Sequence, residues 1–224
     1  MAGRGHEEIA LYRIKEIFYS LQGEGFHTGR AAVFIRFSGC NLWSGLEADR
    51  NSAGCKHCDT DFVGTDGALG GEYEMKGLVE VALSLWPFEE SPFVVCTGGE
   101  PMLQLDERLV NALRDGGCQV AVETNGTLPV ALDIDWVTVS PKADAELRQF
   151  SGNELKLLYP QQTGEGRGRF LDPSLYLHCD FEHFYIQPVD SPDFPNAVME
   201  SISYCLAHPK WTLSLQMHKT AGIK

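Results

Sequence analysis

Three of the chain's seven cysteines, Cys40, Cys55 and Cys58, have the spacing of metal ligands. Two residues separate Cys55 from Cys58, as in many metal-binding pairs, and fourteen separate Cys40 from Cys55. Three thiolates are one short of a closed zinc site or a fully ligated [4Fe–4S] cluster. Such a cluster would leave one iron open to a chelating ligand, whereas zinc would need His57, Asp59 or water as its fourth ligand. The cysteines alone leave both chemistries open.

The other four cysteines carry no such signal. Cys96, Cys118, Cys179 and Cys205 occur singly among apolar residues, which favours small core residues. The N-terminal segment has no uninterrupted apolar run, and no stretch approaches the roughly 20 apolar residues of a membrane span. We therefore expect a cytoplasmic protein, without membrane attachment, whose thiols are free or metal-bound.

Length and charge limit the class of protein. The 224 residues, 43% of them hydrophobic and 22% charged, suffice for one sizeable core. The 18 Lys and Arg residues against 31 Asp and Glu residues give a formal charge of −13. A surface this acidic repels phosphate backbones, so the composition disfavours nucleic-acid binding. It still allows a small anionic ligand in a local basic pocket.

Strands and helices alternate along the sequence. Patterns of β-rich residues predict strands over 31–37, 92–97, 118–124, 135–140, 154–159, 183–189 and 211–216. Helical periodicity predicts helices over 74–86, 102–115 and 196–208. This alternation indicates an α/β fold of parallel strands with right-handed crossovers. A full eight-unit barrel needs about 250 residues, so we expect a partial, incomplete TIM-like barrel.

Almost every predicted strand ends in polar or glycine-rich residues. The segments are SGC, TGGEP, ETNG, SPK, QPVD and QMHK. Because the carboxyl ends of parallel strands meet at one edge, these segments should gather at a single site.

Taken together, these segments resemble the radical S-adenosylmethionine superfamily, whose usual signature is CxxxCxxC. The widened first gap is similar to that of one branch, the 7-carboxy-7-deazaguanine synthase family. The resemblance covers nearly the whole chain and includes SLQGEGFHTGR (20–30), FIRFSGCNLW (34–43), CDTDF (58–62), TGGEP (97–101), ETNG (123–126), SPK (140–142), QPVD (187–190) and SLQMHK (214–219).

The resemblance implies one radical S-adenosylmethionine domain over 1–224, with 41–54 as a surface insertion in the cluster-binding region. It implies a lyase that uses a [4Fe–4S] cluster, S-adenosylmethionine and Mg²⁺. A 5′-deoxyadenosyl radical would start the ring contraction of 6-carboxy-5,6,7,8-tetrahydropterin to 7-carboxy-7-deazaguanine with loss of ammonia, a step of queuosine biosynthesis. Partners would be an electron donor such as flavodoxin and a second copy of the chain in a homodimer.

By resemblance, the site residues fall into three groups. The cluster ligands are Cys40, Cys55 and Cys58, and Thr60 contacts Mg²⁺. The S-adenosylmethionine residues are Gly98, Gly99, Glu100, Ser140, Pro141, Lys142 and Gln187. The substrate residues are Leu21, Gln22, Gly23, Glu24, Arg36, Thr97, Glu123 and His218.

The residue types support several of these assignments and leave alternatives open. Gln22 and Glu24 can pair the amide and guanidine-like edges of a pterin. Arg36 shares a strand face with Phe34, and an inward arginine needs an anion such as a substrate carboxylate. Glu123 can instead form a cap or salt bridge, and Thr60 lies where a helix N-cap is an alternative.

Purely structural roles are also possible for the glycine and proline segments and for the histidine. TGGEP and SPK can be plain turns, Gln187 can be a rim residue, and a lone histidine such as His218 is usually structural. Two other functions remain open from the sequence: a different radical enzyme, such as a glycyl-radical activase, and a non-catalytic zinc-binding protein. The first needs a partner's glycine loop, and the second would be colourless.

Overall fold

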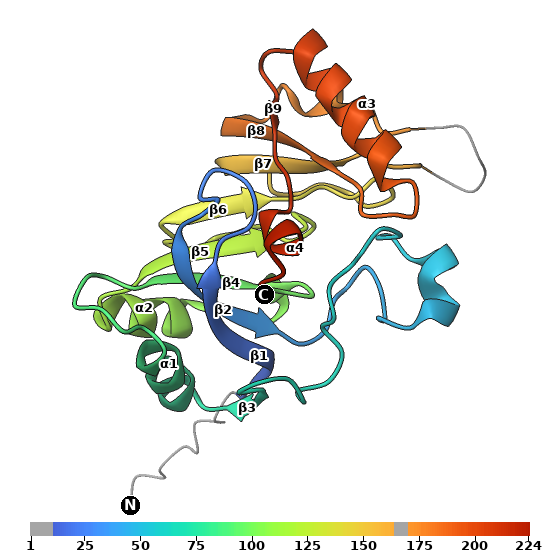
Figure 1. Cartoon of the computed structure of the whole chain (residues 1–224). Coiled ribbons are helices and arrows are strands. Elements are labelled where there is room, and N and C mark those ends of the chain that lie inside the picture. Colours follow the sequence, from blue (N-terminus) through green and yellow to red (C-terminus); the bar gives the residue numbers. More distant parts are fainter. Residues whose placement is uncertain (1–10, 164–169) are drawn as a thin grey trace, which may run out of the picture.

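The chain folds around one curved sheet of nine strands. The computed structural model describes residues 11–163 and 170–224. The strands are β1 (Tyr12–Leu21), β2 (Ala31–Phe37), β3 (Gly71–Tyr73), β4 (Phe93–Gly98), β5 (Gln119–Thr124), β6 (Trp136–Val139), β7 (Ser151–Tyr159), β8 (Asp180–Pro188) and β9 (Thr212–Leu213). Their spatial order is β3-β1-β2-β4-β5-β6-β7-β8-β9, so each strand after β3 extends the same edge (Figure 1).

Strand direction divides the sheet into two parts. β2 and β4 to β9 pair in parallel, whereas β1 pairs antiparallel with both β2 and β3. The parallel part does not close on itself, which confirms the predicted open α/β barrel. The antiparallel strands β1 and β3 are additions that the strand–helix alternation does not predict.

Helices cover the outer face of the sheet. α1 (Met75–Ser84) and α2 (Glu107–Asp115) lie side by side and bury Leu78, Leu109 and Leu113 against the first half of the sheet (Figure 1). α3 (Phe194–Ala207) lies against β8 in the second half. A separate apolar cluster of Ala32, Phe34, Phe93, Val95 and Ala121 fills the opposite, inner face below the carboxyl ends of the strands. In the described ranges, no helix is long and apolar enough to cross a bilayer.

The helix predicted over 102–115 begins later than expected. The structure has a 3₁₀ turn, η2 (Pro101–Leu103), before α2. The Asp106 carboxylate caps α2 by accepting a hydrogen bond from the Leu109 N–H at 2.9 Å, and the Tyr12 hydroxyl donates to the same carboxylate at 2.8 Å. An N-cap residue is not itself helical, so this cap sets the start of α2 at the next residue.

The last predicted strand is also shorter than expected. Of residues 211–216, only β9 pairs with β8, and the short helix α4 (Met217–Ala221) follows. The Ser214 hydroxyl donates to the Gln187 side chain at 3.1 Å, and the Gln216 amide donates to Glu24 at 2.9 Å. Both side chains point into the barrel, so this segment crosses its mouth instead of extending the sheet.

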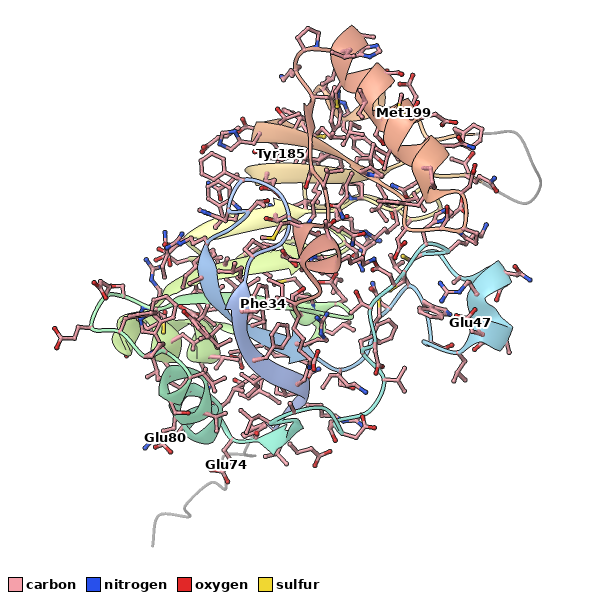
Figure 2. All side chains as sticks on the ribbon, in the orientation of Figure 1. Phe34, Glu47, Glu74, Glu80, Tyr185 and Met199 are labelled. Atoms are coloured by element: carbon pink, nitrogen blue, oxygen red, sulfur yellow. The ribbon has the colours of Figure 1, made fainter. Side chains whose placement is uncertain are left out.

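The segment over 41–54 projects from the mouth of the barrel and carries the 3₁₀ turn η1 (Glu47–Ser52) (Figure 1). Figure 2 labels Glu47 in this turn, and its side chain is exposed. The expectation of a purely surface insertion is wrong at two positions, because Trp43 and Ala53 are buried with Phe62 in a small apolar cluster. Another short turn, η3 (Pro173–Tyr176), precedes β8.

Candidate active site

The carboxyl ends of the strands surround one cavity of about 310 Å³. Every residue that the sequence assigns to the site lines this cavity except Glu100 and Pro141. Strands β1, β2 and β4 to β8 contribute to its wall, as do the cysteine loop and the segment after β9. The predicted convergence of strand ends therefore occurs.

The three spaced cysteines lie together on one wall of the cavity. Cys55 is buried, and Cys40 and Cys58 are half-buried. A hydrogen bond from the Cys58 thiol, opposed by burial, lowers the pKa of Cys55 to about 6, and the same bond raises the pKa of Cys58. The pair thus shares one proton and already favours the thiolate that binds metal.

The turn after β4 approaches the cysteine wall closely. A Cβ atom added to Gly99 would lie 1.9 Å from the Gly39 carbonyl oxygen and 3.1 Å from the Cys40 Cβ. Only glycine fits this contact. Among the described residues, no three His, Cys, Asp or Glu side chains converge on one point that could hold a single metal ion. A cluster of four irons spreads its three ligands more widely, and the donor set of three thiolates beside a glycine turn fits it.

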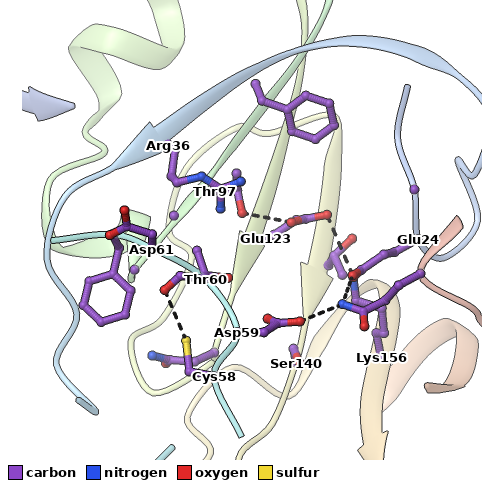
Figure 3. Close-up of a pocket in the computed structure, with 18 of the residues that line it drawn as sticks. Glu24, Arg36, Cys58, Asp59, Thr60, Asp61, Thr97, Glu123, Ser140 and Lys156 are labelled. Carbon is purple, nitrogen blue, oxygen red and sulfur yellow. Dashed lines mark hydrogen bonds and ion pairs between the residues drawn. The ribbon is translucent and has the colours of Figure 1, made fainter. Parts of the chain in front are cut away.

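A buried ion pair forms the opposite wall. Lys156 on β7 pairs with Glu24, and Lys156 also lies 3.9 Å from Glu123 (Figure 3). Burial opposes the charge on Glu24, but Lys156 and a hydrogen bond from Gln216 outweigh it and lower the pKa of Glu24 to about 2. Burial likewise opposes the charge on Lys156, but Glu24, Glu123 and Glu154 raise its pKa. Both groups therefore carry full charge near neutral pH.

The second carboxylate in the cavity is held between two polar side chains. Glu123 accepts hydrogen bonds from the Gln22 amide at 3.0 Å and from the Thr97 hydroxyl at 2.9 Å. These bonds join the loop after β1 to the ends of β4 and β5. Glu123 is thus not a helix cap, whereas the salt-bridge alternative is confirmed by Lys156, and both Glu123 and Glu24 face the cavity.

The anion beside Arg36 comes from the protein itself. Arg36 on β2 stands opposite Glu16 on β1, and its Nε donates to that carboxylate at 3.0 Å. Burial raises the pKa of Glu16, but hydrogen bonds from Lys224 and Arg36 outweigh it, so the net shift is downward. Arg36 faces the cavity, as the sequence pattern predicts, but the prediction missed Glu16 as its partner.

The segment that follows Cys58 does not start a helix. Residues 59–66 are irregular, so the N-cap alternative for Thr60 is wrong. Asp59 pairs with Lys219 and accepts from the Gln216 amide at 3.0 Å, while Asp61 pairs with Lys15 at 2.8 Å. With its two neighbours held in this way, Thr60 faces the cavity (Figure 3).

The segment after β9 closes the cavity over the loop that follows β1. The Met217 N–H donates to the Gly23 carbonyl at 2.9 Å. The His218 ring lies so close that a Cβ atom on Gly23 would come within 2.1 Å of its Nδ1. A side chain at position 23 would therefore displace His218 from its place at the cavity. Elsewhere on the wall, Lys142 donates to the Ser140 hydroxyl at 2.7 Å.

Two assigned residues do not face the cavity. The Glu100 side chain is completely buried and accepts hydrogen bonds from the N–H groups of Met102 and Asn125 and from the Thr124 hydroxyl. It fixes the turn after β4 instead of reaching a ligand. Pro141 is also buried, and its carbonyl accepts a hydrogen bond from the side chain of Gln161.

Sequence reasoning missed Lys156 and Gln216. Lys156 and Glu154 are alternate residues of a strand whose other positions are mostly apolar, and inward charges in a buried strand indicate a polar interior. Gln216 gave a weaker signal, because its segment was predicted to be a strand. The amide oxygen Oε1 of its side chain is buried without a hydrogen-bond partner in the described structure.

The fold and the cavity define a partial-barrel protein of the radical S-adenosylmethionine class. The structure resembles the crystal structure of QueE from Escherichia coli, with a TM-score of 0.67 and 29% identity over 93% of this chain and 95% of that chain. The sequence is 54% identical to the 7-carboxy-7-deazaguanine synthase of Burkholderia multivorans over 214 residues, which is 95% of this chain and 99% of that protein. The protein of the same name from Caulobacter vibrioides is 50% identical over 216 residues, with the same shares covered.

The chain belongs to the 7-carboxy-7-deazaguanine synthase family. No family model matches the sequence, so the assignment depends on these full-length relatives and on the similar fold.

Proposed function

We propose that this protein is a 7-carboxy-7-deazaguanine synthase that contracts the ring of 6-carboxy-5,6,7,8-tetrahydropterin with loss of ammonia. The observation that carries the proposal is the convergence of the cysteines, the glycine turn and the two carboxylates on one cavity. A [4Fe–4S] cluster with S-adenosylmethionine, bound in this cavity, would supply the radical chemistry that starts the ring contraction. Cys40, Cys55 and Cys58 would hold the cluster, and the backbone at Gly98 and Gly99 would approach S-adenosylmethionine.

Three polar residues recognise the pterin edge in this proposal. Gln22 offers both a donor and an acceptor, while Glu24 and Glu123 offer acceptors for the ring N–H and amino groups. All three are held by hydrogen bonds before substrate arrives, so little side-chain freedom is lost on binding. Lys156 keeps its proton on Nζ because carboxylates surround it, so it acts as a fixed positive charge and not as a base.

The substrate carboxylate would bind between Arg36 and Mg²⁺. The bond from Arg36 to Glu16 uses Nε, which leaves the two terminal nitrogens for a bidentate contact. The Thr60 hydroxyl would supply a protein ligand to Mg²⁺, with substrate oxygens and water completing its octahedron. In the same cavity, Ser140 and Lys142 would contact the ribose and carboxylate of S-adenosylmethionine, and Gln187 would contact its adenine.

The cluster test is anaerobic purification followed by iron analysis. We expect a brown protein with broad visible absorption that dithionite bleaches, and conversion of the carboxypterin only when S-adenosylmethionine and a reductant are present. Cys40→Ala should lose the cluster, whereas Cys96→Ala, which alters a buried core thiol, should keep it. A colourless wild-type protein holding one zinc ion, or retention of the cluster in Cys40→Ala with its loss in Cys96→Ala, would refute the proposal.

The remaining partners follow from the resemblance. We infer a small electron-transfer protein such as flavodoxin as reductant, a homodimer, and a cytoplasmic location. Size-exclusion chromatography with light scattering tests the dimer, and flavodoxin-dependent turnover without dithionite tests the reductant.

A further inference from the structure

The projecting turn η1 sends one side chain back to the cysteine loop. Arg50 lies in η1, and its Nη1 donates to the carbonyl oxygens of Lys56 at 3.1 Å and Cys58 at 3.0 Å. These two carbonyls lie on the short stretch of chain that contains Cys55 and Cys58. A single guanidinium nitrogen therefore fixes the spacing of two points in the loop that carries two of the three cysteines.

The other donors of Arg50 hold it in place. Its Nε donates to both carboxylate oxygens of Glu47, at 3.0 and 2.8 Å, and its Nη2 pairs with the same carboxylate. The Arg50 side chain is only 27% exposed, whereas that of Glu47 is 75% exposed. The contacts to the two carbonyls are therefore the shielded ones, and the contact to Glu47 faces solvent.

Packing below the guanidinium connects the turn to the cysteines. The Arg50 guanidinium carbon lies 4.0 Å from the ring centroid of Trp43, which is buried against Phe62 with the rings 5.7 Å apart. Cys40 and Cys58 pack against this same apolar cluster. Arg50 thus covers one side of a small apolar cluster, and Cys40 and Cys58 pack against the same cluster.

We propose that Arg50 is the positioning residue of the cysteine loop, and that the segment over 41–54 is present to carry it. This inference rests on the cluster ligation proposed above. The planar guanidinium lies over Trp43 and so directs Nη1 at both carbonyls, whereas lysine has no planar group that could hold its nitrogen in this direction. Its positive charge beside the loop also favours the more negative, reduced form of a cluster bound there.

The test compares Arg50→Gln and Arg50→Lys with the matched control Glu47→Gln. The control removes only the exposed carboxylate and leaves Nη1 of Arg50 on the two carbonyls. Three measurements are made on anaerobically reconstituted protein: the rate of iron release to a chelator, the reduction potential of the cluster, and its electron paramagnetic resonance spectrum when reduced. Hydrogen exchange at the amides of 55–58 is measured in parallel without the cluster.

We expect iron release about tenfold faster in Arg50→Gln, as loss of charge-assisted hydrogen bonds predicts, with a lower reduction potential. Arg50→Lys should keep the potential near the wild-type value yet release iron severalfold faster, and Glu47→Gln should stay within about twofold of wild type for iron release. A purely structural role for Arg50 would lower the melting temperature without moving the potential or the spectrum, and that result overturns the inference.

Other outcomes are equally decisive. Equal effects of Arg50→Gln and Glu47→Gln on iron release would show that only the turn η1 is stabilised. If Arg50→Gln does not fold, an Arg50→Lys variant with wild-type iron release and exchange refutes the proposal. A wild-type protein that binds no cluster would refute the proposed function instead. Faster amide exchange over 55–58 in the Arg50 variants, but not in the control, would still support the positioning role.

Discussion

Glu154 is a buried group whose charge should make stability depend on pH between about pH 5 and pH 8. Its side chain lies on β7 and is 2% exposed, and it accepts a hydrogen bond from the Phe26 N–H at 2.8 Å. Burial, opposed by Lys156, raises its pKa from 4.5 to about 7. Between these two pH values the folded protein keeps a proton that the unfolded chain has released. The free energy of unfolding therefore falls as pH rises through this range.

The magnitude follows from the two pKa values. At 1.36 kcal/mol for each tenfold change in proton affinity, raising a carboxyl pKa from 4.5 to about 7 costs about 3 kcal/mol of stability once the group is ionised. Glu154→Gln keeps the shape and an acceptor oxygen but cannot ionise. The variant should therefore gain about 2.5 kcal/mol relative to wild type between pH 5 and pH 8, because part of the effect is already present at pH 5.

Urea denaturation at pH 5 and pH 8 measures this difference, with both proteins prepared free of the cluster. Glu182→Gln on β8 is the control, because that side chain is exposed. Groups that do not face Glu154 titrate equally in the variant and the wild type, so their effects cancel. If the stability difference between Glu154→Gln and wild type is the same at both pH values, Glu154 does not hold the proton and the reasoning is wrong.

Three further predictions concern single side chains. Thr60→Val should lower turnover more than S-adenosylmethionine binding and reduce the benefit of added Mg²⁺; an undiminished Mg²⁺ titration would remove Thr60 from the metal site. Tyr12→Phe should cost about 1 kcal/mol in denaturant titrations through loss of its bond to Asp106, with turnover unchanged. Gly99→Ala should abolish cluster retention, because its Cβ would collide with the Gly39 carbonyl; normal iron content after reconstitution would contradict that geometry.

The sequence predicts the site well where residues follow the ends of parallel strands. Glu123 and Ser140 line the same cavity because β5 and β6 are neighbours and the carboxyl ends of parallel strands share an edge. The direction and order of the central strands follow from the same alternation. The two residues assigned to the site but found outside it belong to turns, where the direction of a side chain depends on hydrogen bonds that no pattern encodes.

The sequence does not predict which charges pair inside the barrel. Lys156 and Glu24 are 132 residues apart, and their pairing depends on where the loop after β1 folds over the sheet. The partner of Arg36 was missed for a related reason: Glu16 lies on a strand outside the strand–helix alternation. Register between antiparallel strands, which places Glu16 opposite Arg36, is set by packing over the whole pair.

The way the cavity is closed has a consequence for the order in which the protein can mature. The Gly25 N–H donates to the Ser214 hydroxyl, 189 residues later in the chain, and the loop around Gly23 is covered by residues 217 and 218. During synthesis the loop after β1 emerges early, but it stays uncovered until these residues leave the ribosome. We expect a chain cut before residue 214 to keep most of its sheet, as circular dichroism would report, and yet to bind no substrate. The cavity is therefore completed only after translation of the C-terminal segment, although most of the sheet that surrounds it is made earlier.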